Sequence, residues 1–115
     1  MSPPARITGV RDEATILALI ERIPRSTGAE VIVRQLARSA TSVAANYRAT
    51  CNARSRPEFI ARLGLVVEEA DESACWLEML IRAKAQPRSE MISAQQEATE
   101  LRAIFARSLG TVRAN

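Results

Sequence analysis

The sequence predicts an all-α fold, an antiparallel up-down-up-down four-helix bundle. Apolar residues recur at spacings of three and four, and proline and glycine divide the chain into four such stretches. Apolar residues make up 47% of the chain, but aromatic residues only 3%. A core of Leu, Ile, Val and Ala favours packed helices over sheets. The 115 residues correspond to one domain, expected at 11–115 after a flexible N-terminal segment at 1–10.

The first two helices are delimited by proline and by a capping pattern. We expect the first helix to begin near Asp12, as its N-cap, and to end before Pro24, because the residue preceding a proline disfavours helical geometry. Thr27 and Glu30 match a capping box, in which the hydroxyl and the carboxylate each satisfy a free backbone N–H group. The second helix is therefore predicted from about residue 28 to about 54.

The start of the third helix is marked more clearly in the sequence than the start of the second. Ser55 and Glu58 form a second capping box, and Pro57 lies in the first turn, where its missing N–H group is tolerated. The helix is predicted to continue to about residue 85, and Pro87 closes the segment.

The fourth helix is predicted to start at Ser89, acting as its cap, and to stop at Gly110. The loops between the helices are short. Short loops force consecutive helices to pack side by side in opposite directions, which leads to the bundle.

The second helix has three faces instead of two. An apolar face is expected to join the core, and a polar face is expected to form a hydrogen-bonded seam against another helix, meeting Glu69 or Glu72. The third face is cationic. The apolar face holds Ile32, Leu36, Ala40, Val43 and Tyr47, the polar face Gln35, Ser39, Ser42 and Asn46, and the cationic face Arg34, Arg38 and Arg48, with Arg54 near the helix end.

The third helix has a second apolar flank beside its core face. It contains Leu65, Trp76, Met79 and Leu80, interleaved with acidic residues that include Glu69 and Glu72. Exposed Trp and Met are typical of subunit interfaces, so we predict that copies of the chain associate here, with the polar seam as part of the contact. The alternative is a wide core that takes in Trp76.

Charge is distributed unevenly, although the net charge is only +3. Residues 34–62 contain six arginines and one acid, whereas residues 63–81 contain five acids and no base. The contrast favours pairing of the two helices, with Glu68, Glu69, Asp71 and Glu72 as ion-pair partners of Arg38 or Arg62. We predict that Arg34, Arg38, Arg48 and Arg54 contact nucleic acid. The alternative is a solvated helix face.

Several classes of function are disfavoured. The chain has no histidine. This excludes catalytic triads in which histidine activates a serine or a cysteine, and it also excludes zinc and di-iron sites with histidine ligands. Cys51 and Cys75 are interpreted as reduced packing or surface thiols. We expect no catalytic residue, metal or cofactor. Neither a membrane-spanning run nor a signal-peptide pattern is evident, so a cytoplasmic protein is expected.

Three ordered motifs resemble the four-helix-bundle proteins encoded in intervening sequences of bacterial 23S ribosomal RNA genes. They are Gln35-Leu-x-Arg-Ser-x-x-Ser42-Val-x-Ala-Asn46-Tyr-Arg48, Ser55-x-x-Glu58-Phe59, and Glu69-Ala-Asp-Glu72 followed by Trp76-Leu-Glu78. The resemblance implies a ring-shaped homopentamer without known enzymatic activity and a role in binding RNA or DNA. Ala49 departs from the pattern, because family members usually carry glutamate there.

Two functional hypotheses follow. The first is a non-enzymatic, pentameric protein that binds RNA or another nucleic acid through its arginine-rich helix faces. The alternative is a protein-interaction accessory subunit of a reverse transcriptase or another mobile-element system, a role that related bundles perform.

Overall fold

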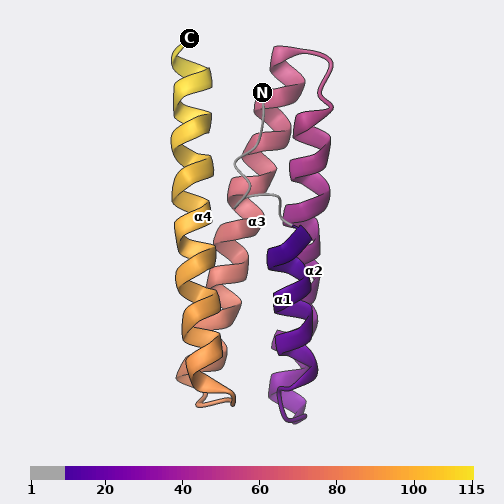
Figure 1. The fold of residues 1–115 in the computed structure, drawn as a ribbon, viewed down its shortest axis with the longest axis vertical. Helices are drawn as coiled ribbons and strands as arrows, with labels where there is room; N and C mark the ends of the chain where they lie inside the picture. Colours follow the sequence, from indigo (N-terminus) through magenta and orange to yellow (C-terminus); the bar gives the residue numbers. More distant parts are fainter. Residues whose placement is uncertain (1–9) are drawn as a thin grey trace.

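A computed structural model describes residues 10–115, with side chains from Thr15 onward. The described residues form four α-helices and no strand, which confirms the predicted all-α class (Figure 1). The helices are α1 (Val10–Glu21), α2 (Thr27–Cys51), α3 (Arg56–Arg82) and α4 (Arg88–Ala114). The predicted flexible segment 1–10 lies outside the described residues except for Val10, where α1 begins.

The long helices α2, α3 and α4 determine the elongated shape, which measures 46 × 23 × 19 Å between Cα extremes. Helix α3 packs along both α2 and α4. In Figure 1, the loop between α2 and α3 lies at the upper end, and the loop between α3 and α4 lies at the lower end. The shorter α1 packs on α2 and α4 and covers only the lower half of the view.

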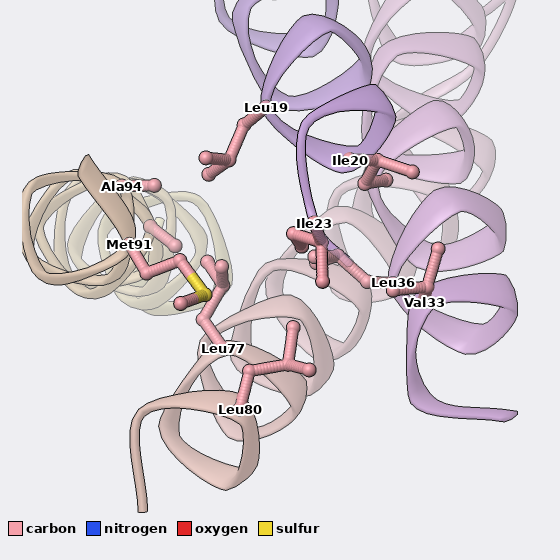
Figure 2. Packing of buried hydrophobic residues seen from close by; sticks show 10 residues of the cluster. Leu19, Ile20, Ile23, Val33, Leu36, Leu77, Leu80, Met91 and Ala94 are labelled. Carbon is pink, nitrogen blue, oxygen red and sulfur yellow. The ribbon is translucent and has the colours of Figure 1, made fainter. Parts of the chain in front are cut away.

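The core of the described residues has a lower and an upper cluster. The lower cluster combines buried side chains from all four helices, and Figure 2 shows how they converge. The upper cluster draws its buried side chains from α2, α3 and α4 only. The lower cluster contains Leu19, Ile20, Ile23, Val33, Leu36, Leu77, Leu80, Met91, Ala94 and Ala98, and the upper one Val43, Leu63, Val66, Ala70, Leu101, Phe105 and Leu109.

The first two helix starts differ from the prediction. Helix α1 begins at Val10, so Asp12 lies inside it and is not its N-cap. The N-cap of α2 is Ser26, whose Oγ accepts a hydrogen bond from the Ala29 N–H group at 3.2 Å. Thr27 is therefore not the cap. With Ser26 as N-cap, the third helical position is Ala29, which has no carboxylate, so no capping box forms. The Glu30 carboxylate pairs with Arg25 and Arg34 instead.

The start of α3 confirms Ser55 as a cap. Its Oγ accepts from the Glu58 N–H group at 3.2 Å, and Pro57 lies in the first turn. The Glu58 carboxylate accepts from the backbone N–H group of Arg54, at 3.2 Å, and so satisfies a donor one residue before the expected one.

Helix α4 starts earlier and ends later than predicted. Its N-cap is Pro87, without a side-chain hydrogen bond, so Ser89 is not the cap. The helix passes through Gly110 and ends at Ala114. The Arg56 guanidinium binds the Val112 carbonyl, which satisfies one of the free oxygens of the last turn. One glycine in a helix costs only about 1 kcal/mol, which such contacts offset.

Helices α2 and α3 are shorter than predicted because local contacts end them. Helix α2 stops at Cys51, where the Asn52 side-chain amide donates to the Arg48 carbonyl at 3.0 Å. Helix α3 stops at Arg82, and Lys84 adopts a positive φ of 60°, which a continuing helix does not allow.

Candidate functional site

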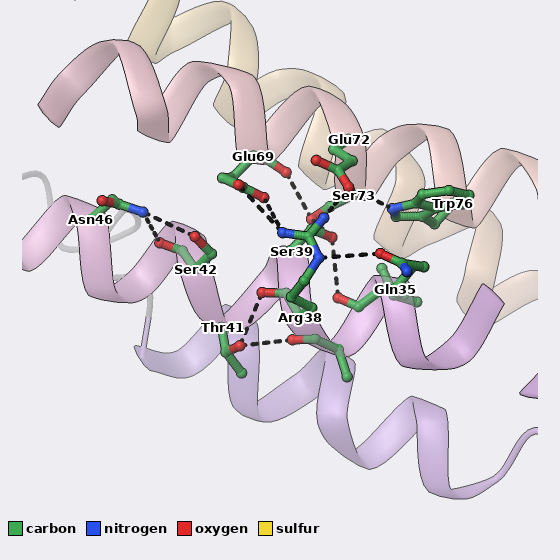
Figure 3. Close-up of polar contacts among 12 residues, drawn as sticks. Gln35, Arg38, Ser39, Thr41, Ser42, Asn46, Glu69, Glu72, Ser73 and Trp76 are labelled. Carbon is green, nitrogen blue, oxygen red and sulfur yellow. Dashed lines mark hydrogen bonds and ion pairs between the residues drawn. The ribbon is translucent and has the colours of Figure 1, made fainter. Parts of the chain in front are cut away.

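The polar seam of α2 meets α3 through two buried serines. The Ser73 hydroxyl donates to Ser39 Oγ at 2.8 Å and also lies 3.0 Å from the Glu69 carbonyl oxygen (Figure 3). Ser39 in turn donates to the Leu36 carbonyl at 3.2 Å. Ser39 and Ser73 are almost fully buried, 0% and 3% exposed. Small hydroxyl side chains thus hold the two helices close while keeping their own polar groups satisfied.

Arg38 lies over this serine pair and connects α2 to two carboxylates of α3. One of its guanidinium nitrogens lies 3.3 Å from a Glu69 oxygen, and another binds Glu72. Its Nε donates to Gln35 at 3.1 Å. The hydrogen bond to Glu72 is the main cause that raises the pKa of the Arg38 guanidinium. Trp76 joins the network by donating from Nε1 to Glu72 at 3.2 Å (Figure 3). The expected ion pairing with Arg38 is therefore confirmed for Glu69 and Glu72. Asp71 pairs instead with Arg102 of α4, at 3.4 Å.

The other two predicted seam residues bond along their own helix. The Asn46 side-chain amide donates to both the carbonyl and the hydroxyl of Ser42, each at 2.9 Å. Ser42 and Asn46 are half-buried. The polar face therefore reaches α3 through Ser39, which meets Ser73. The contacts that it was expected to make with Glu69 and Glu72 are made by Arg38 of the cationic face instead.

The apolar flank of α3 is partly open. Leu65 and Met79 are 39% and 45% exposed. Trp76 is half-buried and packs against the lower core cluster, as the wide-core alternative expects. Leu80 is not part of this flank, because it is fully buried in the core. Leu65, Glu69, Glu72, Trp76 and Met79 nevertheless share one helix face, since they follow one another at spacings of four and three.

The four predicted nucleic-acid contacts divide into two pairs. Arg34 forms an ion pair with Glu30 at 3.2 Å, and Arg38 is held by the network described above. The guanidinium groups of Arg48 and Arg54 have no acidic partner among the described residues. The structure thus leaves positive charge free at the end of α2 and not along its whole length.

Arg62 on α3 and Arg107 and Arg113 on α4 also have no acidic partner among the described residues. Arg56 and Arg88 have none either, but their guanidinium groups bind the backbone carbonyls of Val112 and Ile81. The loop between α2 and α3 and the last turns of α4 lie at the same end of the molecule (Figure 1). The bond from Arg56 to the Val112 carbonyl joins them. We call residues 45–65 and 103–115 the arginine end.

The arginine end differs in charge from the rest of the molecule. It contains six arginines and one glutamate, a side-chain charge of +5. Residues 15–44 and 66–102 contain eight basic and ten acidic residues. The sequence reasoning missed the contribution of α4, because it considered only the apolar face of that helix. The available signal was the pair of arginines after residue 102, where no acid follows.

The family assignment rests on a match to a protein-family model. The model of the 23S rRNA-intervening sequence protein matches residues 13–107. The chain belongs to this family. A crystal structure of a family relative agrees with that assignment. The relative is described as a protein with unknown function from the S23 ribosomal protein family of Bacteroides thetaiotaomicron VPI-5482. It is 29% identical, has a TM-score of 0.80, and the match covers 90% of this chain and 96% of that one. No curated protein matches the chain.

Two of the three family motifs of this chain lie next to each other in the structure. The α2 motif and the acidic motif of α3 face one another across the seam, and Arg38, Glu69 and Glu72 form their junction. Ala49, where the resemblance implies a glutamate, lies on α2 and is half-buried. The motifs therefore have a structural role in joining α2 to α3, whatever they contact beyond the chain.

The described residues contain neither a clustered set of metal ligands nor a membrane-spanning helix. The described residues contain no group of three or more Cys, Asp or Glu side chains arranged to hold a metal ion. None of the helices in the described part combines the length and hydropathy needed to cross a bilayer. Cys51 and Cys75 are exposed free thiols.

Proposed function

We propose that this protein is a non-enzymatic homo-oligomer that binds nucleic acid, RNA first of all, through its arginine end. The observation that carries the proposal is the set of five arginines at one end whose guanidinium groups neither pair with a carboxylate nor bind a backbone carbonyl among the described residues. A guanidinium group matches phosphate oxygens with a fork of donors. Each phosphate that it neutralises releases condensed counterions, which drives binding.

The four predicted arginines are proposed to contribute unequally to nucleic-acid affinity. Arg48 and Arg54 lie within the arginine end and need no rearrangement to reach phosphate. Arg34 and Arg38 would first have to leave the carboxylates that hold them, so their proposed contribution is smaller. Adding Arg62, Arg107 and Arg113 changes the proposed surface from a stripe along α2 to the end of the bundle.

The proposed assembly is a ring-shaped homopentamer. Its support is the set of exposed large apolar side chains, which are Leu65 and Met79 on α3, Leu17 on α1 and Val31 on α2. Different patches that pack head to tail generate rings when the rotation closes. The polar seam, with Gln35, Ser42 and Asn46, and the face that includes Glu69, Glu72 and Trp76 would border this contact. A ring repeats the arginine end and raises avidity without new contacts.

The alternative function is an accessory subunit for a reverse transcriptase or another mobile-element enzyme. The observation that favours it is again the open apolar flank at Leu65 and Met79, since such a surface fits a protein partner. In either case we propose a cytoplasmic protein, where the exposed thiols would stay reduced.

Binding to a structured RNA, measured by fluorescence anisotropy at several salt concentrations, tests the proposal. We expect affinity to fall steeply with salt and to drop further in the variant Arg48→Ala/Arg107→Ala. The matched control is Arg82→Ala, which removes an equally exposed arginine that pairs with Glu78 outside the arginine end. Absence of binding near physiological salt, or an equal loss in the control, would leave the accessory-subunit alternative.

Arg34→Ala distinguishes the two versions of the surface. The arginine-end version expects a smaller loss from Arg34→Ala than from Arg48→Ala, although both arginines lie on α2. Equal losses would restore the stripe along the helix as the contact surface.

A further inference from the structure

The arginine end lacks an aromatic platform for stacking bases. The sequence contains four aromatic residues, and the structure accounts for all of them. The rings of Tyr47 and Phe105 pack on each other with centroids 5.4 Å apart, and Phe59 packs on the upper core cluster. Trp76 is bonded to Glu72 outside the arginine end. Proteins that bind single strands usually combine a basic groove with exposed aromatic rings.

The free arginines are spread over an area and do not follow one line. They come from the end of α2 and its loop, from the second turn of α3, and from the last turns of α4. The bundle that presents them is 23 × 19 Å across. A duplex presents two rows of phosphates on either side of a groove, whereas a single strand presents one row. A two-dimensional set of cations can neutralise both rows at once.

Two of the three side-chain amides at this end are already engaged. Asn46 donates to the carbonyl and hydroxyl of Ser42, and Asn52 donates to the Arg48 carbonyl. To recognise adenine, an asparagine side chain must offer its donor and its acceptor together. Among the amides of this end Asn115 alone has no such bond, so phosphate contacts predominate at the arginine end.

We infer that the arginine end takes double-stranded nucleic acid through its phosphates, without stacking or reading bases. The inference rests on the proposed function and names the ligand class of that surface. If each of the five arginines neutralises one phosphate, the slope of log K against log [salt] reaches about −4.5 for each chain bound to a duplex. Binding should be independent of base sequence.

The test compares three fluorescent probes with the full-length protein: a 20-base-pair RNA duplex, a DNA duplex of the same length, and oligouridine with the same number of phosphates. We expect at least one duplex to bind about tenfold or more tightly than oligouridine. Two duplexes of different sequence should bind equally. Arg62→Ala/Arg107→Ala should reduce duplex binding and flatten its salt dependence, whereas Arg82→Ala should not.

The outcomes separate this inference from the proposed function. If oligouridine binds as tightly as the duplexes and the arginine variants abolish that binding, the duplex inference fails and the proposed function stands. If duplexes of different sequence differ strongly in affinity, the phosphate-only contact is wrong. If no probe binds, both proposals fail. Preference for the RNA duplex over the DNA duplex supports the inference and identifies the A-form helix as the ligand.

Discussion

At the scale of single residues, the sequence pattern predicted which side chains of α2 face another helix but not which side chains they contact. The alternation of polar and apolar positions on α2 correctly indicated that Ser39 faces another helix. It did not indicate that Ser73 is the partner, because a serine among the apolar residues of α3 has no distinguishing pattern. The bond between them depends on the register of two helices, which only the packed structure provides.

The buried serine pair leads to the first prediction. A double-mutant cycle of Ser39→Ala and Ser73→Ala should give a coupling energy of about 1 kcal/mol in the free energy of unfolding, because either single change leaves the other hydroxyl without its partner. The alanine substitutions change helix propensity additively, so this effect cancels in the cycle. Chemical denaturation at fixed protein concentration measures it. Additive effects of the two substitutions would show that the bond is not coupled to folding.

A second prediction concerns Tyr47, the single tyrosine of the chain. Burial, with a smaller contribution from Cys51, raises its pKa to about 12. Because the folded protein favours the neutral phenol, this contribution to stability is complete below pH 10, the unfolded value, and is lost as the pH rises toward 12. Tyrosinate absorbance should therefore rise near pH 12 in the folded protein and near pH 10 in denaturant. A folded-state midpoint near 10 would contradict the burial of this ring.

At the scale of the element, the four helices were predictable, but most of their ends were not; the start of α3 at its Ser55 cap is the exception. Hydrophobic periodicity and proline positions locate helices, whereas ends depend on single hydrogen bonds. Ser26 and Thr27 are both acceptable caps by residue type, and the backbone geometry selected the first. Gly110 has the residue type of a helix end, yet the contact of Arg56 with the last turn allows α4 to continue.

Cap substitutions provide the third prediction. Ser26→Ala and Ser55→Ala should each lower the free energy of unfolding by about 1 kcal/mol, because each removes the acceptor for a free N–H group at a helix start. Thr27→Ala and Ser89→Ala, which alter neighbouring residues without a capping bond, serve as matched controls and should have little effect. Thermal or chemical denaturation measures the differences. A larger loss in a control than in its cap variant would assign the cap to the predicted position.

At the scale of the whole molecule, charge distribution was only half predictable. The excess of arginine in residues 34–62 is visible in the sequence, and so is the following acidic stretch. Which arginines remain free depends on side chains that come together from different helices, such as Arg38 with Glu69. The contribution of α4 appears only when its last turns are seen beside the loop that follows α2.

The association of copies supplies the fourth prediction. Light scattering should give a mass several times the chain mass of 12.6 kDa, with five times as the proposed value. Leu65→Glu or Met79→Glu should lower that mass, because a charge at a contact between copies is costly to bury. Ala103→Glu, an exposed site on α4, is the control and should leave the mass unchanged. A wild-type mass of one chain at high concentration would contradict the assembly.

The separation of the arginine end from the more acidic remainder makes the molecule an electric dipole. In a ring with a cyclic symmetry axis, all subunit dipoles have the same component along that axis. A closed ring of such subunits would therefore be two-sided, with one strongly cationic surface and an opposite surface on which basic and acidic side chains nearly balance. Long polyanions would then lie across a single face, and the opposite face would remain accessible to other molecules while the first is occupied.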